Sequence, residues 1–237
     1  NAVNGTRDEP IVLLSAWCGL RLGEIFALKW DDINWKEDTI RVDENKAVSE
    51  KGYVDKSPKS DNGIRNIAAP KELMTILKNY RMGLVEAENI VIGKKIKTKK
   101  PTNRKAFRHI FNRAIRALLI KYKSNSIANV QEDRKEEFMA ELSAIQERLF
   151  PMRPDSYSTY FGKLIKEKKL PLIRFHDLRH YHATWLYNQG VPDQYAAGRL
   201  GHDIKTLKGI YQHLGVDVKK EMDTLIRERL GDTKAKK

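Results

Sequence analysis

The chain has 237 residues, a length that suits one large domain or two small ones, and its 41% of hydrophobic residues excludes a disordered chain. Forty-five basic and 31 acidic side chains leave a net charge of +14, which favours a polyanionic partner, either nucleic acid or an anionic membrane surface. The single cysteine, Cys18, excludes an internal disulfide and a multi-cysteine zinc site, and no apolar run approaches the ~20 residues needed to cross a bilayer. The first ten residues carry neither a signal-peptide pattern nor an initiator methionine, so we expect a fragment of a longer protein from a reducing compartment.

The first third of the chain predicts helices followed by strands. Over residues 9–30, apolar residues recur at helical spacing on both sides of a glycine-containing turn at residues 19–23, which predicts a helix, a turn and a second helix. Short β-type clusters over residues 30–69 predict a small antiparallel sheet of about three strands. Pro70 then opens a helix that we expect to run to about Tyr80.

A strongly basic segment follows. Between Glu88 and Glu132 there is no acidic residue, but eight lysines and four arginines. We expect a mobile loop over residues 94–105 and an amphipathic helix over residues 107–118. The one-signed charge favours a surface that faces phosphates, and a plain solvated helix is the alternative. The basic residues expected on its polar side are Lys105, Arg108 and Arg116.

The rest of the chain is predicted to be helical with sharp breaks. A mixed-charge helix over residues 132–149 is expected to end at Pro151 and Pro154. Further helices are predicted over residues 174–188, 193–199, 206–214 and 221–230.

Five of the six histidines lie between residues 176 and 213, and two kinds of chemistry can explain such a cluster. His176 and His180 have the spacing of a zinc-binding pair on a helix, but the metalloprotease glutamate is missing and Arg179 would repel a cation. The other explanation is phosphoryl transfer without a metal, in which arginines bind the nonbridging oxygens while other side chains supply a nucleophile, a base and an acid. Serine-hydrolase, phosphate-loop and dinucleotide motifs are absent from the sequence.

Five segments, in chain order, resemble the motifs of the tyrosine recombinases, or phage-type integrases. They are Cys18-Gly-Leu-Arg21-Leu-Gly-Glu24, Ser57-Pro-Lys59-Ser60 with Arg65, His176-Asp-Leu-Arg179-His180, Leu200-Gly-His202, and Tyr211-Gln-His213. A single such segment would be weak support, whereas five in order across most of the chain are specific.

The resemblance implies a covalent mechanism. Tyr211 would attack the scissile phosphate and form a 3′-phosphotyrosine, with release of a 5′-hydroxyl. Arg21 and Arg179 would bind the nonbridging oxygens, and Glu24 would orient Arg21. Because the phosphotyrosine bond stores the energy for rejoining, the resemblance implies no cofactor and no metal.

The remaining roles are implied in the same way. Lys59 would protonate the departing 5′-oxygen, although Lys56 and Lys51 in the same segment are alternatives. His176 would accept the proton of the tyrosine, and His202 would donate a hydrogen bond to the phosphate.

Two further residues have supporting or open roles. His180 would support its neighbours by hydrogen bonding, and Arg65 fits strand pairing or a DNA contact equally well.

The resemblance also implies a fold and an organisation. We expect an α+β fold: one mainly helical catalytic domain over residues 1–237 with a small antiparallel three-stranded sheet at its edge, and without the family's amino-terminal core-binding domain. Within it we expect a basic segment and helical insertion over about residues 85–155, where the role of residues 121–154 is unassigned, and a tail helix over residues 215–237 that docks on a neighbouring protomer.

The function implied is site-specific DNA recombination for a phage or mobile element. Double-stranded DNA would be the partner, with a homotetramer on DNA, a monomer without it, and accessory DNA-bending proteins, in the bacterial cytoplasm and away from membranes. A type IB topoisomerase and a non-enzymatic DNA-binding regulator are the rival interpretations.

Overall fold

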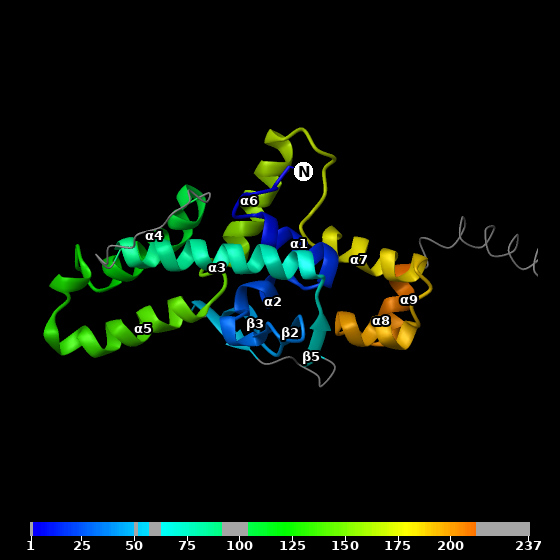
Figure 1. Ribbon diagram of the computed structural model, residues 1–237, viewed down its shortest axis with the longest axis horizontal. Coiled ribbons are helices and arrows are strands. Elements are labelled where there is room, and N and C mark those ends of the chain that lie inside the picture. The colour runs from blue at the N-terminus through cyan, green and yellow to red at the C-terminus, as the bar shows by residue number, and fades with distance from the viewer. Residues whose placement is uncertain (1, 50–51, 57–62, 92–103, 212–237) are drawn as a thin grey trace, which may run out of the picture.

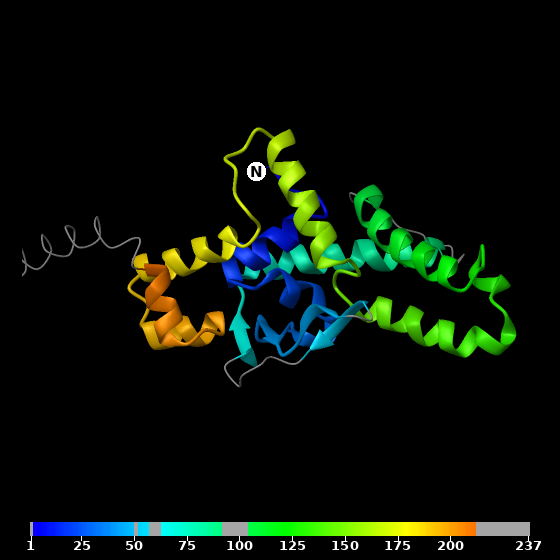
Figure 2. The same cartoon turned by 180° about the vertical axis from the view of Figure 1, so that it is seen from behind.

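The computed structural model of the protein describes residues 2–49, 52–56, 63–91 and 104–211 (Figure 1). It is mainly helical with little sheet, as the α+β prediction required. In both views the molecule is elongated: helices α4 and α5 extend from one end, α7 to α9 form the other, and α6 projects from the side that carries the amino terminus (Figures 1 and 2).

Two helices joined by a tight turn open the fold, which confirms the prediction for residues 9–30. Helix α1 spans Glu9–Cys18 and helix α2 spans Leu22–Ala27. Between them Gly19 adopts a left-handed backbone with φ 71°, and its N–H caps the end of α1. The turn keeps the carboxyl end of α1 close to the amino end of α2, and the candidate site lies beside these two helix ends.

The strands form a small sheet and a separate hairpin. Strands β1 (Ile33–Asn34), β2 (Thr39–Val42) and β5 (Arg65–Ala68) make an antiparallel sheet in the order β1-β2-β5. Strands β3 (Asn45–Ser49) and β4 (Gly52–Lys56) pair only with each other among the described strands. The three-stranded prediction is thus confirmed, but the predicted β-cluster around Tyr53 belongs to the hairpin. Its partner β3 was not predicted, because the sequence Asn-Lys-Ala-Val-Ser has little apolar alternation.

Helix α3 spans Lys71–Val91 and is about twice as long as predicted. Its first half buries Leu73, Leu77 and Tyr80, spaced on one face. The helix continues through Gly83, since a glycine inside a helix costs only about 1 kcal/mol and α4 (Arg104–Lys121) packs along α3.

Helix α5 (Lys135–Glu147) returns beside α4 after the short 3₁₀ turns η3 (Ile127–Asn129) and η4 (Glu132–Arg134). We name the described part of α4, η3, η4 and α5 the arm. Another 3₁₀ turn, η1 (Trp30–Asp32), leads into β1. The loop predicted over residues 94–105 lies mostly outside the described residues.

Helix α6 (Pro154–Glu167) was not predicted. The sequence suggested that Pro154 only breaks the preceding helix, but it begins α6, at a position where its fixed φ and missing N–H are tolerated. Tyr157, Phe161 and Ile165, four residues apart, face the main core.

The carboxyl-terminal helices confirm the predicted breaks. Helix α7 spans Asp177–Asn188, α8 spans Asp193–Leu200 and α9 spans Ile204–Tyr211. They enclose a small apolar cluster of their own and pack on α1 through α7. The helix predicted over residues 221–230 lies outside the described residues. No helix in the described part of the chain has the length and apolar character needed to span a membrane.

Candidate catalytic site

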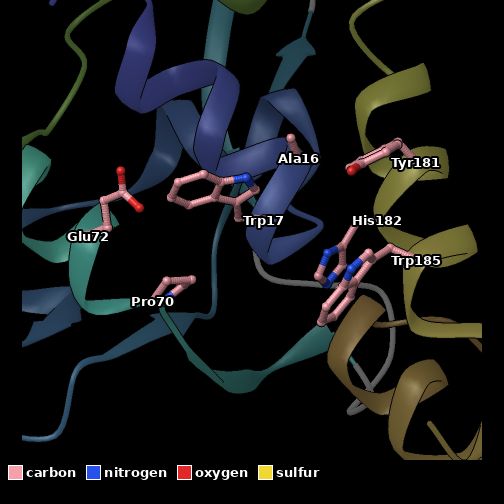
Figure 3. A pocket seen from close by; sticks show the side chains of 7 residues that line it. All are labelled: Ala16, Trp17, Pro70, Glu72, Tyr181, His182 and Trp185. Carbon is pink, nitrogen blue, oxygen red and sulfur yellow. The ribbon is translucent and has the colours of Figure 1, made fainter. Parts of the chain in front are cut away.

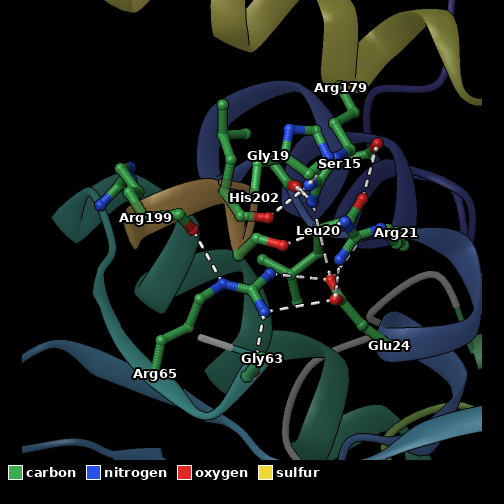
Figure 4. Close-up of polar contacts among 12 residues, drawn as sticks. Ser15, Gly19, Leu20, Arg21, Glu24, Gly63, Arg65, Arg179, Arg199 and His202 are labelled. Atoms are coloured by element: carbon green, nitrogen blue, oxygen red, sulfur yellow. Dashed lines mark hydrogen bonds and ion pairs between the residues drawn. The ribbon is translucent and has the colours of Figure 1, made fainter. Parts of the chain in front are cut away.

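Glu24 is the centre of a cluster of three arginines, which come from the turn before α2, from β5 and from α7 (Figure 4). Its Oε1 accepts a hydrogen bond of 2.8 Å from Nη1 of Arg21, and its Oε2 accepts one of 2.9 Å from Nη2 of Arg65. Nη1 of Arg179 lies 3.8 Å from the same Oε2. One carboxylate therefore brings together Arg21 and Arg179, the two arginines that the sequence assigned to one anion site.

The position of Glu24 follows from the first turn of α2. Its Oε2 also accepts a hydrogen bond of 2.8 Å from the backbone N–H of Arg21, so the side chain caps the helix that carries it. Burial acts to raise the pKa of Glu24, but the guanidinium groups of Arg65, Arg179 and Arg21 outweigh burial and hold the pKa below its ordinary value. Glu24 is therefore ionised at neutral pH and balances part of the clustered positive charge.

Arg179 is almost fully buried, with 2% of its surface exposed. Nη1 donates to the carbonyl of Gly19, and Nη2 donates to the carbonyl of Leu200. Burial, followed by the charge of Arg21, lowers the pKa of Arg179 to about 9. Its Nε is buried and has no hydrogen-bond partner among the described residues, which is rare for a buried polar group.

His202 lies against Arg179, with its Nε2 2.8 Å from Nη2 of the arginine. Because a guanidinium can only donate, Nε2 must accept, and the ring proton sits on Nδ1. Burial, followed by the charges of Arg179 and Arg21, lowers the pKa of His202 to about 3, so the ring is neutral at physiological pH. Nδ1 has no partner among the described residues, so its N–H is a second buried donor beside the first.

The carboxyl end of α8 joins the two arginines to one backbone segment. Gly201 adopts a left-handed conformation with φ 60° that ends α8, and its carbonyl accepts a hydrogen bond of 3.2 Å from Nη2 of Arg21. The neighbouring carbonyl of Leu200 binds Arg179. Cations are stabilised at this end of a helix because its last carbonyls carry partial negative charge.

His176 lies at the amino end of α7, one turn before His180, and the two rings meet edge to face with centroids 4.7 Å apart. Burial, followed by the neighbouring His180 and Arg179, lowers the pKa of His176, so a neutral ring is available as a proton acceptor. No group of three or more metal-ligating side chains occurs among the described residues.

Of the remaining predicted catalytic residues, Tyr211 is placed by its backbone and Lys59 is not placed. Tyr211 is the last residue of α9, which packs on α7 and α8, but its side chain lies outside what the structure describes. Lys59 lies outside the described residues, between β4 and β5. At the start of β5, Arg65 contacts Glu24.

The donors of Arg65 bind within the protein. Nε donates to the carbonyl of Arg199 at 2.8 Å, and Nη1 donates to the carbonyl of Gly63 at 3.0 Å and to Glu24 at 3.2 Å. The sequence left strand pairing and a DNA contact open for Arg65, and these contacts favour a role within the protein over a DNA contact. Arg116 is exposed on α4, and Lys105 and Arg108 lie on the same helix.

Sequence reasoning missed two residues beside the cluster, Arg199 and His182. Neither residue was assigned a role from the sequence. Nε of Arg199 donates to Nε2 of His182 at 3.1 Å. The only signal in the sequence is that Arg199 directly precedes the Leu-Gly-His segment.

The sequence profile of the phage integrase family matches residues 1–126 and 118–217. The chain belongs to this family, and its fold is that of a tyrosine recombinase catalytic domain. It is 26% identical over 223 residues to a tyrosine recombinase XerC-like protein of Caldanaerobacter subterraneus subsp. tengcongensis, a match that covers 90% of this chain and 47% of the relative. It is 28% identical over 207 residues to the ICEBs1 integrase of Bacillus subtilis, covering 86% of this chain and 44% of that relative.

Solved structures share the fold. The Tn1549 transposon integrase in complex with transposon right end DNA superposes with a TM-score of 0.56 at 20% identity, over 92% of this chain and 58% of that one. The XerA recombinase gives a TM-score of 0.53 at 20% identity, over 95% of this chain and 61% of that one. The chain spans about half the length of the curated relatives it matches.

Proposed function

We propose that this chain is the catalytic part of a site-specific DNA recombinase that cuts and rejoins strands through a covalent phosphotyrosine. The observation that carries the proposal is the placement of Arg21 and Arg179 on one carboxylate, beside two buried donors without partners among the described residues. Such donors match the charge and geometry of the nonbridging oxygens of a phosphodiester.

The reaction begins when the phenolic oxygen of Tyr211 attacks the scissile phosphorus. His176 takes the phenolic proton, since its lowered pKa keeps it neutral. The bond from phosphorus to the 5′-oxygen breaks, Lys59 donates a proton to that oxygen, and the 3′-phosphate stays on Tyr211. Attack by another 5′-hydroxyl reverses these steps and joins the strands.

The guanidiniums stabilise the transition state. Arg21 and Arg179 bind the two nonbridging oxygens, on which negative charge concentrates as the phosphorus becomes pentacoordinate. His202 donates its Nδ1–H to one of them, because Arg179 fixes the proton on that nitrogen. Glu24 does not react; it holds the arginines in place.

The nucleophile is tested with a nicked suicide substrate, from which the cleaved fragment diffuses away and leaves the enzyme on the DNA. We expect the wild type to form a covalent protein–DNA adduct that maps to Tyr211. Tyr211→Phe should form none and keep its DNA affinity, whereas Tyr195→Phe, which alters an exposed tyrosine of α8, should behave as the wild type. Adducts that persist in Tyr211→Phe would assign the nucleophile elsewhere.

The assignment of Lys59 is tested by the leaving group. Lys59→Ala should cleave a phosphodiester slowly but recover when sulfur replaces the 5′-oxygen, because a thiolate departs without a proton. If the sulfur substrate instead restores cleavage by Lys56→Ala or Lys51→Ala, and not by Lys59→Ala, the general acid is one of those two lysines.

The proposal extends to assembly and location. We expect a single catalytic domain that is monomeric alone and forms a homotetramer on paired DNA sites, with residues 215–237 docked on a neighbouring protomer, in the bacterial cytoplasm. Accessory DNA-bending proteins would assist. Light scattering with and without DNA tests the stoichiometry, and a complex that stays at one protomer per site would contradict it.

A further inference from the structure

Arg199 connects four segments that meet behind the arginine cluster. Its Nε donates to Nε2 of His182 in α7, and its Nη2 donates to the carbonyls of Trp17 at 3.2 Å and of Ala68 at 3.0 Å. Its own carbonyl accepts from Nε of Arg65. One side chain at the end of α8 therefore fixes the ends of α1 and β5 and the middle of α7.

His182 is the acceptor that orients this arginine. It is 2% exposed, and the backbone of Ala16 provides a second hydrogen bond to its ring. The ring stacks on Trp185 at 6.0 Å between centroids, and it lines a surface pocket of about 320 Å³ together with Trp17 and Tyr181 (Figure 3). Burial, followed by the charge of Arg199, lowers the pKa of His182 to about 4, so at neutral pH the ring can accept at Nε2 while it donates at Nδ1.

The Arg199–His182 pair lies directly beside the carbonyls that hold the arginines of the site. Leu200, whose carbonyl binds Arg179, follows Arg199 in the chain. The carbonyl of Gly19 also binds Arg179. Gly19 lies so close to α7 and α8 that a Cβ on it would be 2.7 Å from His182 Cδ2 and 2.6 Å from Leu200 Cδ2. The separation between the ends of α1 and α8 therefore sets where the guanidinium of Arg179 lies.

We infer that Arg199 and His182 are a positioning pair for the anion site, which they control by fixing the ends of α1 and α8 against each other. This inference rests on the proposed function, because it assigns the pair to the same phosphate-binding arginines. Neither residue needs to touch DNA. Their effect passes through the carbonyls of Gly19, Leu200 and Gly201, which hold Arg179 and Arg21.

Lysine cannot replace Arg199 in this arrangement. The guanidinium donates from Nε and Nη2 in fixed directions to a ring nitrogen and two carbonyls, whereas an ammonium on a flexible stem offers no such fork. Misplacement of a catalytic group by about 1 Å can lower a rate by about 100-fold, so a small shift of α8 is enough to be measured.

His182 provides the decisive test, because two substitutions separate hydrogen bonding from ring packing. His182→Phe keeps a ring of similar size but removes the acceptor, while His182→Gln keeps an acceptor near the position of Nε2 and loses the ring. We expect His182→Phe and Arg199→Lys to lower the single-turnover rate of adduct formation at saturating DNA by about tenfold or more. His182→Gln should recover to within about threefold of the wild type.

The DNA affinity and the urea unfolding midpoint of each variant are also measured. Cleavage assays are run under conditions in which the variant is fully folded. DNA affinity should change by less than about threefold, because the pair acts on the rate and not on the DNA contacts. Arg134→Lys, an arginine on the arm, is the matched control and should cleave as the wild type.

The outcomes are distinguishable. If His182→Phe cleaves at the wild-type rate, or cleaves faster than His182→Gln, the ring is only a packing element and the inference is wrong. If Arg199→Lys does not fold, the two His182 variants alone decide. A wild type that forms no adduct would overturn the proposed function and this inference together, whereas wild-type adducts with unaffected variants would overturn only the inference.

Discussion

The cluster around Glu24 and the ion pairs of the arm use the same residue types but differ in burial. The Glu24 side chain is 6% exposed and contacts three arginines. On the arm, Glu141 is 36% exposed and binds Nζ of Lys121 and, at 2.9 Å, the hydroxyl of Tyr122. Charges in water interact weakly, while buried charges depend on their partners. Burial, more than the number of charges, distinguishes the candidate site from the other charged clusters of this very basic protein.

The largest effect should follow from removing the central carboxylate charge. Glu24→Gln keeps the shape of the side chain but leaves the buried guanidiniums uncompensated, so we expect a loss of about 3–5 kcal/mol in the free energy of unfolding. Urea denaturation measures it. A loss below about 1 kcal/mol would mean that the cluster behaves like the exposed pairs of the arm.

The second largest effect should be a loss of stability at acidic pH. His182 accepts a proton near pH 6.5 in the unfolded chain but only near pH 4 in the folded one, so protonation favours unfolding as the pH falls through this window. From pH 7 to pH 5 the free energy of unfolding should drop by about 2 kcal/mol from this residue alone. His202, whose folded pKa is about 3, acts in the same direction.

The control for this pH dependence is His182→Phe. The variant has no titrating ring at this position, so its free energy of unfolding should fall by about 2 kcal/mol less than that of the wild type over the same range. Parallel curves for the two proteins would contradict the assignment.

A smaller effect is expected on the arm. Glu141→Gln removes an exposed pairing, so the free energy of unfolding should fall by no more than about 1 kcal/mol. Adduct formation should stay at the wild-type rate. The same urea titrations provide the measurement, and a loss comparable to that of Glu24→Gln would erase the contrast between the two regions.

The smallest change should appear in the salt dependence of DNA binding. If Arg116 on α4 contacts a phosphate, Arg116→Gln should reduce the slope of log K against log salt by about 0.9. The arginine is exposed, so stability should stay constant. If the slope for Arg116→Gln equals that of the wild type, this face of α4 is solvated surface that does not contact phosphate.

The sequence predicted the local features well. Helices α1 and α2 follow from apolar spacing around a turn, and the break predicted after residue 199 falls at Gly201, which ends α8 in a left-handed conformation. The motifs also selected Arg21, Glu24, Arg179 and His202, which the structure brings together. Helix α6 escaped prediction because a proline that starts a helix looks the same in sequence as one that ends it.

The remaining features depend on contacts that leave no local signal. Arg179 is held by the carbonyls of Gly19 and Leu200, and every residue has a carbonyl, so no side-chain pattern marks these two. The pairing of Arg199 with His182 likewise arises only when α7 and α8 are packed. Sequence motifs named the groups that would bind an anion and the carboxylate of Glu24 beside them, but not the carbonyls or the Arg199–His182 pair.

Gly19 also sets a limit on how this site can be redesigned. The hydrogen that stands in place of a side chain occupies a gap too small for a methyl group, and its φ of 71° suits few other residues. The distance of α7 and α8 from this turn, and with it the geometry of the candidate anion site, thus depends on the absence of a Cβ at position 19. Engineering that aims to widen this site for a different nucleic-acid backbone would have to begin at Gly19 and move α7 and α8 together.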